Sequence, residues 1–500
     1  MWPEITALLC ILVIALLLSL PCSRKPKNNT PQLPPGPRGL PLIGHLHLLG
    51  SLPHHSLHKL SQKHGPIMFL RLGLIPTIVL TSPEYTELFL KTHDSIFASR
   101  PQIQASKYLS YGYKNLVFAQ YGSYWRSMRK LCTIELLSSS KIESFRSMRY
   151  EEVCNLVQFL KNGSQLGEGI DLTAKIYSVI EDMTYRMILG CKDRYNFKST
   201  LQETVRLAGL VNVSDYIPFL APLDLQGLGR QLKATSKALD VLLEKIIEEH
   251  VANPKQQQDK DFTDVMLSLM ESNNTRELQL NRDNIKAIIL DMLAGSVDTS
   301  STSIEWTIAE LLKNPRVMKV LQNELEDVVG RDRMVEETDL IKLDYLKMVI
   351  KETMRIHPIA PLLIPHESTE DITVNGYFIP KKSRVLVNTW AIGRDPNVWS
   401  ENAEEFYPER FIGANMDVEG HDFRFIPFGT GRRKCPGLQL GFIVVQLVVA
   451  QLVHCFNLEL PNGKSGDDLD MDERFGLSVP RANHLIVVPR YRLKPHLIMQ

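Results

Sequence analysis

The sequence has almost no net charge and no closely spaced pair of cysteines. Its 500 residues include 57 Lys and Arg against 56 Asp and Glu, so no general electrostatic attraction to nucleic acid is expected. The seven cysteines are odd in number and widely spaced, and no Cys-x-x-Cys occurs. This pattern argues against a disulfide framework and a zinc site, and it favours a reducing compartment.

The chain also lacks the glycine patterns that cradle nucleotide phosphates. It has no phosphate loop, and no complete Gly-x-Gly-x-x-Gly follows a strand-like segment. Gly227 and Gly229 begin such a pattern, but the third glycine is absent. If the chain carries out a redox reaction, its electrons must therefore come from a partner and not from an NADPH site of its own.

The N-terminus begins with a long apolar run. Residues 5–20 are almost entirely apolar, Glu4 is the only charged side chain before them, and three basic residues follow closely. Basic residues behind an apolar segment keep that side in the cytosol, whereas a cleaved signal peptide, the alternative, normally carries them in front. The predicted organisation is a transmembrane anchor over 1–22, a basic and Pro-rich hinge over 23–39, and a catalytic domain over 40–500.

The remainder of the chain has no long linker, repeat or low-complexity run, so we expect one globular domain. Helical periodicity dominates residues 138–330 and 340–356. Short β-rich pieces lie at 67–80, 372–387 and 485–488. The sequence predicts a mainly α fold with small β-sheets.

The most informative segment is a glycine-rich turn that leads one cysteine to an apolar helix. It reads FGTGRRKCPG over 428–437, and the expected helix covers 438–456. Glycines let the backbone approach a flat, bulky group, while the helix start and nearby cations favour a thiolate at Cys435. A thiolate is a strong axial ligand for haem iron and promotes O–O cleavage. The alternative is an inert, buried cysteine, the usual state of a lone one.

This turn resembles the haem-binding loop of the cytochrome P-450 superfamily. The characteristic positions are filled by Phe428, Gly431, Arg433, Cys435 and Gly437. Other segments resemble the family in the same order along nearly the whole chain: the Pro-rich hinge, Trp125 and Arg129 in YWRSMRK, Glu352 and Arg355 in Glu-x-x-Arg, and Arg410 in Pro-Glu-Arg-Phe. The overall style is that of membrane-bound plant enzymes of specialised metabolism.

The resemblance implies haem b with an axial thiolate from Cys435. The residues expected to contact the cofactor are Arg433, Trp125, Arg129, His366, Phe428, Gly431 and Gly437, the first four at the propionates. His366 stands where many relatives have Arg; the alternative is a loop histidine in solvent. Glu352, Arg355 and Arg410 are expected to form a structural ion network.

A second motif lies in the expected helix over 283–313. Its sequence GSVDTS covers 295–300, and the resemblance implies that Thr299 donates a hydrogen bond at the oxygen site while Asp298 supplies protons. The alternative is an ordinary polar stripe on a helix. Ser296 stands where the family usually has Gly. This departure puts the family's local helix bulge in question and is expected to narrow the pocket.

The predicted activity is hydroxylation of a small hydrophobic plant metabolite with O2. Terpenoids, phenylpropanoid-type or biphenyl-type aromatics and alkaloids all fit. Two alternatives keep the haem: an oxygen-independent isomerase or dehydratase of lipid peroxides, and a non-catalytic haem carrier or sensor at the membrane. The segments expected near the haem are 103–111, 293–297, 360–364 and 475–479.

The predicted electron donor is NADPH–cytochrome P-450 reductase. The resemblance places both proteins on the endoplasmic reticulum membrane, with this chain as a single-pass protein whose catalytic domain faces the cytosol. Lys130, Arg432 and Lys434 could meet an acidic partner, although plain surface charge explains them equally well.

Overall fold

The computed structural model describes residues 32–193, 197–256, 260–272 and 279–494. The predicted anchor over 1–22 and the first part of the hinge lie outside the described residues. The rest of the hinge packs on the domain, since the Phe69 N–H donates to the Pro35 carbonyl at 2.8 Å. A Cβ at Gly36 would lie 2.1 Å from the Phe69 carbonyl oxygen, so only glycine fits this approach.

Helices make up most of the described chain. They are α2 (Pro53–His64), α3 (Pro83–Glu87), α4 (Asp94–Phe97), α5 (Gln104–Leu109), α6 (Ser123–Leu131), α7 (Ser139–Ser144), α8 (Arg146–Leu166), α9 (Leu172–Leu189), α10 (Phe197–Gly209), α11 (Leu228–Ala252), α12 (Phe262–Glu271), α13 (Arg282–Lys313), α14 (Pro315–Val329), α15 (Asp344–Ile356), α16 (Thr389–Ile392), α17 (Pro396–Trp399) and α18 (Leu438–Cys455).

The strands form three small sheets. They are β1 (Ile67–Leu72), β2 (Ile75–Leu80), β3 (Ile170–Asp171), β4 (His366–Glu367), β5 (Ile372–Val374), β6 (Tyr377–Ile379), β7 (Arg384–Val387), β8 (Phe456–Glu459) and β9 (Ile486–Tyr491). The largest sheet has the order β1-β2-β7-β4, and only its β2–β7 pair is parallel. The others have the orders β3-β9-β8 and β5-β6.

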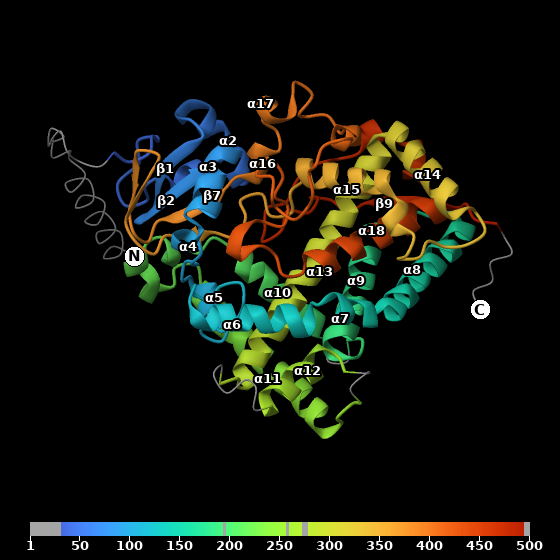
Figure 1. Cartoon of the computed structure of the whole chain (residues 1–500), viewed down its shortest axis with the longest axis horizontal. Coiled ribbons are helices and arrows are strands. Elements are labelled where there is room, and N and C mark those ends of the chain that lie inside the picture. Colours follow the sequence, from blue (N-terminus) through green and yellow to red (C-terminus); the bar gives the residue numbers. More distant parts are fainter. Residues whose placement is uncertain (1–31, 194–196, 257–259, 273–278, 495–500) are drawn as a thin grey trace, which may run out of the picture.

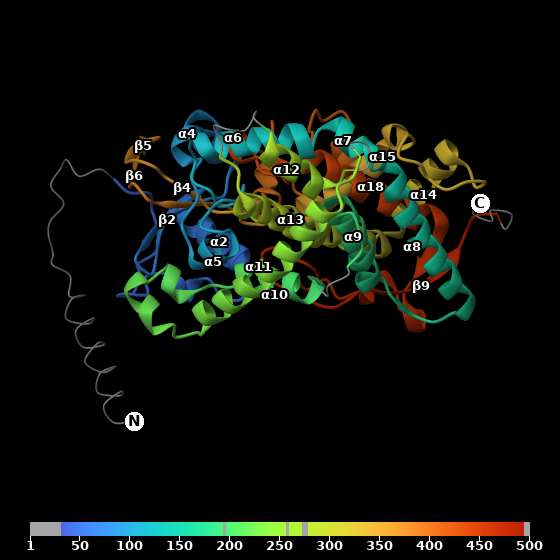
Figure 2. The same ribbon diagram turned by 90° about the horizontal axis from the view of Figure 1, so that it is seen from below.

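Helix α13 runs through the middle of the molecule and positions the site. The side chain of Asn281 caps its first turn by accepting the Asn284 N–H, and the helix continues for 32 residues. It packs against α9, α15 and α18. Figure 2 shows α13 between the large sheet at one end and α8, α14 and β9 at the other. Figure 1 shows α18 beside it.

The predicted fold class is confirmed. The β-rich piece at 67–80 is the β1–β2 hairpin, and the two long apolar helices begin and end within one residue of expectation. Among the described residues, α18 alone is long and apolar enough to cross a membrane, but 78% of it is buried inside the protein. It is therefore a core helix.

Candidate active site

Cys435 stands at the wall of a cavity of about 320 Å³. The Cys435 N–H donates to the Phe428 carbonyl at 2.9 Å and closes the loop before α18. Phe428 and Gly437 also line the cavity, and a Cβ at Gly437 would lie 4.0 Å from the Cys435 sulfur. The loop thus presents one sulfur to the cavity, and at Gly437 beside it the backbone carries no side chain that would obstruct a flat ligand.

Gly431 does not line this cavity. Its φ is +65°, and a Cβ there would lie 2.5 Å from the Leu90 carbonyl oxygen and 3.0 Å from the Asp94 carboxylate. Gly431 therefore shapes the loop and its packing against Leu90 and Asp94, and its predicted contact with the cofactor stays a prediction.

Burial and the nearby groups act on Cys435 in opposite directions. Burial raises the pKa of the Cys435 thiol, while the Gly437 N–H and the charges of Arg129 and Lys434 lower it. The groups expected to favour the thiolate are therefore present, and burial opposes them. A metal cation bound at the sulfur would favour the thiolate further, and the thiolate stays a prediction.

Three guanidinium groups line the cavity without a carboxylate partner among the described residues. They belong to Arg100, Arg129 and Arg433. Arg433 donates to the Ala98 and Ala119 carbonyls at 2.6 and 2.5 Å, and burial together with the charge of Arg129 lowers its pKa to about 10. Buried cations of this kind require anions.

This cation cluster fits the two propionates of haem. Arg129 donates to the Lys434 carbonyl at 2.7 Å, and Arg100 to the Ile364 and Pro365 carbonyls at 2.5 and 3.0 Å. Sequence reasoning missed Arg100, because nothing in its local spacing distinguishes it from a surface arginine.

Trp125 and His366 also line the cavity, each with one ring nitrogen already bonded to backbone. The Trp125 Nε1–H donates to the Leu116 carbonyl at 2.9 Å, and the Arg433 guanidinium lies 4.2 Å from the centre of the Trp125 ring. His366 Nδ1 lies 2.9 Å from the Phe97 carbonyl. Burial and the charge of Arg100 hold the pKa of His366 well below its usual value.

The tautomer of His366 decides what it can do. A carbonyl only accepts, so the proton must be on Nδ1, and Nε2 of the neutral ring carries a lone pair. The His366 side chain is buried in β4, so the alternative of a loop histidine in solvent is excluded. As a propionate donor it would have to gain a proton.

Thr299 faces the cavity, and Asp298 does not. The Thr299 hydroxyl donates to the Gly295 carbonyl one turn earlier at 2.7 Å. Asp298 instead accepts from the Tyr177 hydroxyl at 3.0 Å and from the Ser478 hydroxyl. The two predicted residues are sequence neighbours that point to different surroundings.

Ser296 does not interrupt the helix. Its hydroxyl donates to the Met292 carbonyl at 2.5 Å, and α13 continues as a regular α-helix through this point. The side chain lines the cavity and takes up space that a glycine would leave open.

The predicted ion network is assembled away from the cavity. Arg355 donates two hydrogen bonds of 2.7 Å to Glu352, and Arg410 donates a third of 2.8 Å. The Tyr407 N–H also donates to Glu352 at 2.8 Å. The side chains of Glu352 and Arg355 are both 0% exposed.

The rest of the cavity wall is mostly apolar. Two predicted substrate segments contribute to it through Ala360, Ile364 and Gly295, whereas 103–111 and 475–479 do not border it. Sequence reasoning missed the wall from α9 and the carboxylate of Asp291. Asp291 had a signal, because it is a lone acid in an apolar turn, eight residues before Thr299 on the same broad face.

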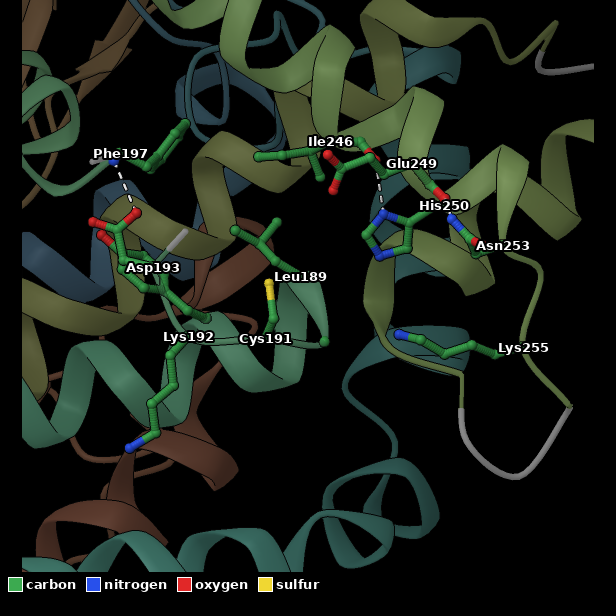
Figure 3. A pocket seen from close by; sticks show the side chains of 12 residues that line it. Leu189, Cys191, Lys192, Asp193, Phe197, Ile246, Glu249, His250, Asn253 and Lys255 are labelled. Carbon is green, nitrogen blue, oxygen red and sulfur yellow. Dashed lines mark hydrogen bonds between the residues drawn. The ribbon is translucent and has the colours of Figure 1, made fainter. Parts of the chain in front are cut away.

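A second hollow of about 380 Å³ lies at the C-terminal ends of α9 and α11. Leu189 and Cys191 face it from one side, and His250 and Lys255 from the other (Figure 3). The Lys255 ammonium lies 2.5 Å from the Asp261 carboxylate, which also contacts His250 at 3.0 Å. This hollow contains none of the predicted site residues.

The comparisons with known proteins identify the family. The family model described as cytochrome P450 matches residues 34–488. The chain belongs to the cytochrome P450 family. Cytochrome P450 CYP736A12 of Panax ginseng is 56% identical over 99% of this chain and 100% of its own length. Desmethyl-deoxy-podophyllotoxin synthase of Sinopodophyllum hexandrum is 43% identical over 98% of this chain and 96% of its own.

The solved structures agree with this assignment. A zebra fish cytochrome P450, in a structure with abiraterone, has a TM-score of 0.74 and 28% identity, covering 88% of this chain and all of that one. This plant-type P450 is a reductase-dependent haem-thiolate monooxygenase that acts on specialised metabolites. The relatives support this activity over the isomerase and haem-carrier alternatives.

The residues of the cavity fit the family's cofactor. When bound, haem with its cysteine thiolate supplies the activation of dioxygen. Among the described residues, Cys435 is the only cysteine that lines the cavity, and the cations of Arg100, Arg129 and Arg433 line the same cavity. The enzyme takes a small-molecule substrate and O2, and it receives electrons from a redox partner.

Proposed function

We propose that this P450 hydroxylates an apolar plant metabolite held in the cavity between Cys435 and Thr299. One observation carries the proposal: both side chains line the same mostly apolar cavity. An apolar wall with few polar groups binds a hydrophobic molecule, and the shape of the cavity then determines the orientation of that molecule. The relatives' names include the maker of a podophyllotoxin-type compound, so aromatic substrates of that kind belong in the test.

The proposed proton route begins at Thr299. Its hydroxyl can turn from the Gly295 carbonyl toward the oxygen site and hold a proton there. Asp298 precedes it in the chain, but its carboxylate lies with Tyr177 and Ser478, so it must turn, or act through water, to supply the proton.

The proposed cofactor contacts follow from charge. Arg433, Arg129 and Trp125 would meet the propionates, with Arg100 as a further cation. Each guanidinium has N–H groups left over for a charge-assisted bond to a carboxylate, which is about twice as strong as a bond between neutral groups. The single Nε1–H of Trp125 stays on the Leu116 carbonyl, and its ring would contact the propionates. His366 would join them only when protonated.

The test is turnover in membranes that contain the full chain and reductase. Terpenoids, phenylpropanoid-type or biphenyl-type aromatics and alkaloids are supplied with NADPH and O2, and products are measured by mass. We expect a product heavier by one oxygen atom that disappears without NADPH or with Cys435→Ser. Conversion of lipid peroxides without NADPH, or a haem spectrum with no turnover, would contradict the proposal.

We propose NADPH–cytochrome P450 reductase as the electron donor. Lys130 is exposed on α6, whereas Arg432 lies 3.7 Å from the Asp94 carboxylate and Lys434 lies 2.5 Å from the Glu419 carboxylate. Lys130→Glu should raise the reductase concentration needed for half-maximal turnover, and added salt should weaken the wild-type interaction. Lys237→Glu, at an exposed lysine on α11, is the matched control. Equal behaviour of both variants would reassign Lys130 to plain surface charge.

We propose that the chain lies on the endoplasmic reticulum membrane through residues 1–22 and an apolar surface of the domain. The exposed side chains of that surface are Leu40, Ile43, Leu74, Leu210, Val211, Phe219, Leu223 and Leu225. The segments are adjacent, because the Leu74 N–H donates to the Tyr216 carbonyl at 2.8 Å. Exposed apolar patches of this kind bind membranes or other proteins.

A glycosylation sequence in the domain allows the proposed cytosolic orientation to be tested. Asn162 begins an Asn-x-Ser sequence and is exposed on α8. With the domain in the cytosol, Asn162 stays unmodified and glycosidase treatment leaves the mass of the protein unchanged. A mass shift that is absent in Asn162→Gln would place the domain in the lumen.

A further inference from the structure

One carboxylate at the cavity wall has no role in the proposed reaction. Asp291 lies deep in the molecule at the cavity wall, and it accepts three N–H groups from one loop. Its Oδ1 receives the Asn115 side-chain amide at 2.7 Å, and its Oδ2 receives the Leu116 and Val117 N–H groups at 2.6 and 3.2 Å. Burial raises the pKa of Asp291 to about 7, and these three donors act against the rise. An ionised carboxylate is an acceptor only, which suits three donors.

The same loop carries a second set of bonds in the opposite direction. The Leu116 carbonyl accepts the Trp125 Nε1–H at 2.9 Å and one Arg433 N–H at 3.1 Å. This carbonyl and the Val117 N–H belong to one peptide unit. A trans peptide unit is planar and its C=O and N–H point in opposite directions. A carboxylate that fixes the N–H therefore also fixes the direction of the C=O.

We propose that Asp291 is a positioning residue for the haem-binding wall: it orients the Leu116–Val117 peptide unit, whose carbonyl holds Trp125 and Arg433 at the cavity. This inference rests on the proposed contacts of Trp125 and Arg433 with the propionates. Asp291 acts from α13, the helix that also carries Thr299, so one helix sets both the oxygen side and the propionate side of the cavity.

A simple tie between helix and loop is the competing explanation, and the chain offers a matched control for it. Lys114 and Asp283 join the same loop to the same helix at 2.7 Å. Their side chains are 33% and 49% exposed, and the bond does not involve the peptide unit of Leu116. Loss of Asp283 therefore removes a helix–loop tie without touching the wall.

The experiment measures haem loss from the full-length, haem-loaded protein to excess apomyoglobin. Asp291→Asn should lose haem about tenfold faster than the wild type, which corresponds to about 1.4 kcal/mol. Asp283→Asn should stay within about twofold, as expected for an exposed ion pair. Equal rates in both variants would overturn the proposal.

A double-mutant cycle with Trp125→Phe separates positioning from general stability. Trp125→Phe removes the Nε1–H, so Asp291→Asn should have a smaller effect in that background if it acts through the Leu116 carbonyl. Independent, multiplicative effects on haem loss would overturn the inference and leave the role of Trp125 intact. A Trp125→Phe variant with the haem-loss rate of the wild type would overturn both the inference about Asp291 and the proposed role of Trp125. If Asp291→Asn gives too little folded protein, Asp291→Glu enters the same cycle, because it keeps the charge but displaces the carboxylate.

Discussion

Replacing Arg355 by alanine is the sharpest test of how the fold supports the cofactor. Arg355 donates two hydrogen bonds to Glu352 and others to the carbonyls of Gly393, Ala403 and Glu405. The variant leaves a buried carboxylate with only part of its partners and removes a donor from all three carbonyls. Breaking one side of a buried pair costs about 3–5 kcal/mol, a large part of a typical stability of about 5–15 kcal/mol.

The assay is urea unfolding together with haem content from the reduced carbon monoxide spectrum of the same preparation. We expect Arg355→Ala to unfold at much lower urea and to contain little haem. Arg355→Lys should fall between it and the wild type, because an ammonium cannot reproduce the two parallel bonds to Glu352. Arg316→Ala is the control, since Arg316 pairs with Glu409 but is 56% exposed, and such pairs contribute about 0–1 kcal/mol. An Arg355→Ala protein with normal haem and the same unfolding midpoint as Arg316→Ala would refute the structural role.

Three further outcomes follow from the site and its surroundings. Thr299→Ala should bind haem normally yet convert more NADPH into peroxide, measured as product per NADPH, whereas unchanged coupling would remove Thr299 from the proton route. Tyr177→Phe removes one hydroxyl from Asp298 and should lower coupling severalfold while the haem content stays constant; a hydrogen bond to a charged group contributes about 1.5–3 kcal/mol. Although burial opposes it, the hydrogen bond from His54 and the charge of that ring lower the pKa of Glu473 to about 2. A carboxylate with a lowered folded-state pKa stabilises the protein above its unfolded pKa of about 4.3, and this contribution is lost as the pH falls toward 2. Urea midpoints of the wild type and Glu473→Gln should therefore converge over that interval, and a constant difference down to pH 2 would exclude the linkage.

The fold and the cysteine loop could be predicted because their signals are local. Periodicity reveals helices such as α13, and a cysteine between glycines and an apolar helix marks the loop at Cys435. The partners of Glu352 could be named because the resemblance supplied them. Their bond lengths and complete burial required the structure.

The surroundings of Arg100 and Asp298 could not be predicted, because they depend on contacts between distant segments, which periodicity does not encode. Arg100 reaches the cavity only because the 361–365 segment folds beside it and offers two carbonyls. Asp298 looked like a partner of Thr299, but neighbouring residues on a helix point about 100° apart, and Tyr177 and Ser478 occupy the direction in which Asp298 points. The opposing effect of burial on the Cys435 thiol could not be predicted, because the sequence shows the nearby cations and not the packing around the sulfur.

The length of α13 has a consequence for how this enzyme tolerates change. Asp283, Asp291 and Thr299 follow one another at intervals of eight residues, and each has a different role, at a surface tie, at the loop of Leu116 and at the oxygen side of the cavity. Because the α-helix turns by about 100° per residue, deletion of a single residue between Asp283 and Asp291 would change the direction of the first relative to the other two by about 100°. One helix thus fixes the relative directions of all three side chains. A substitution therefore affects one of these roles at a time, whereas an insertion or deletion changes the alignment between all the residues before it and all those after it.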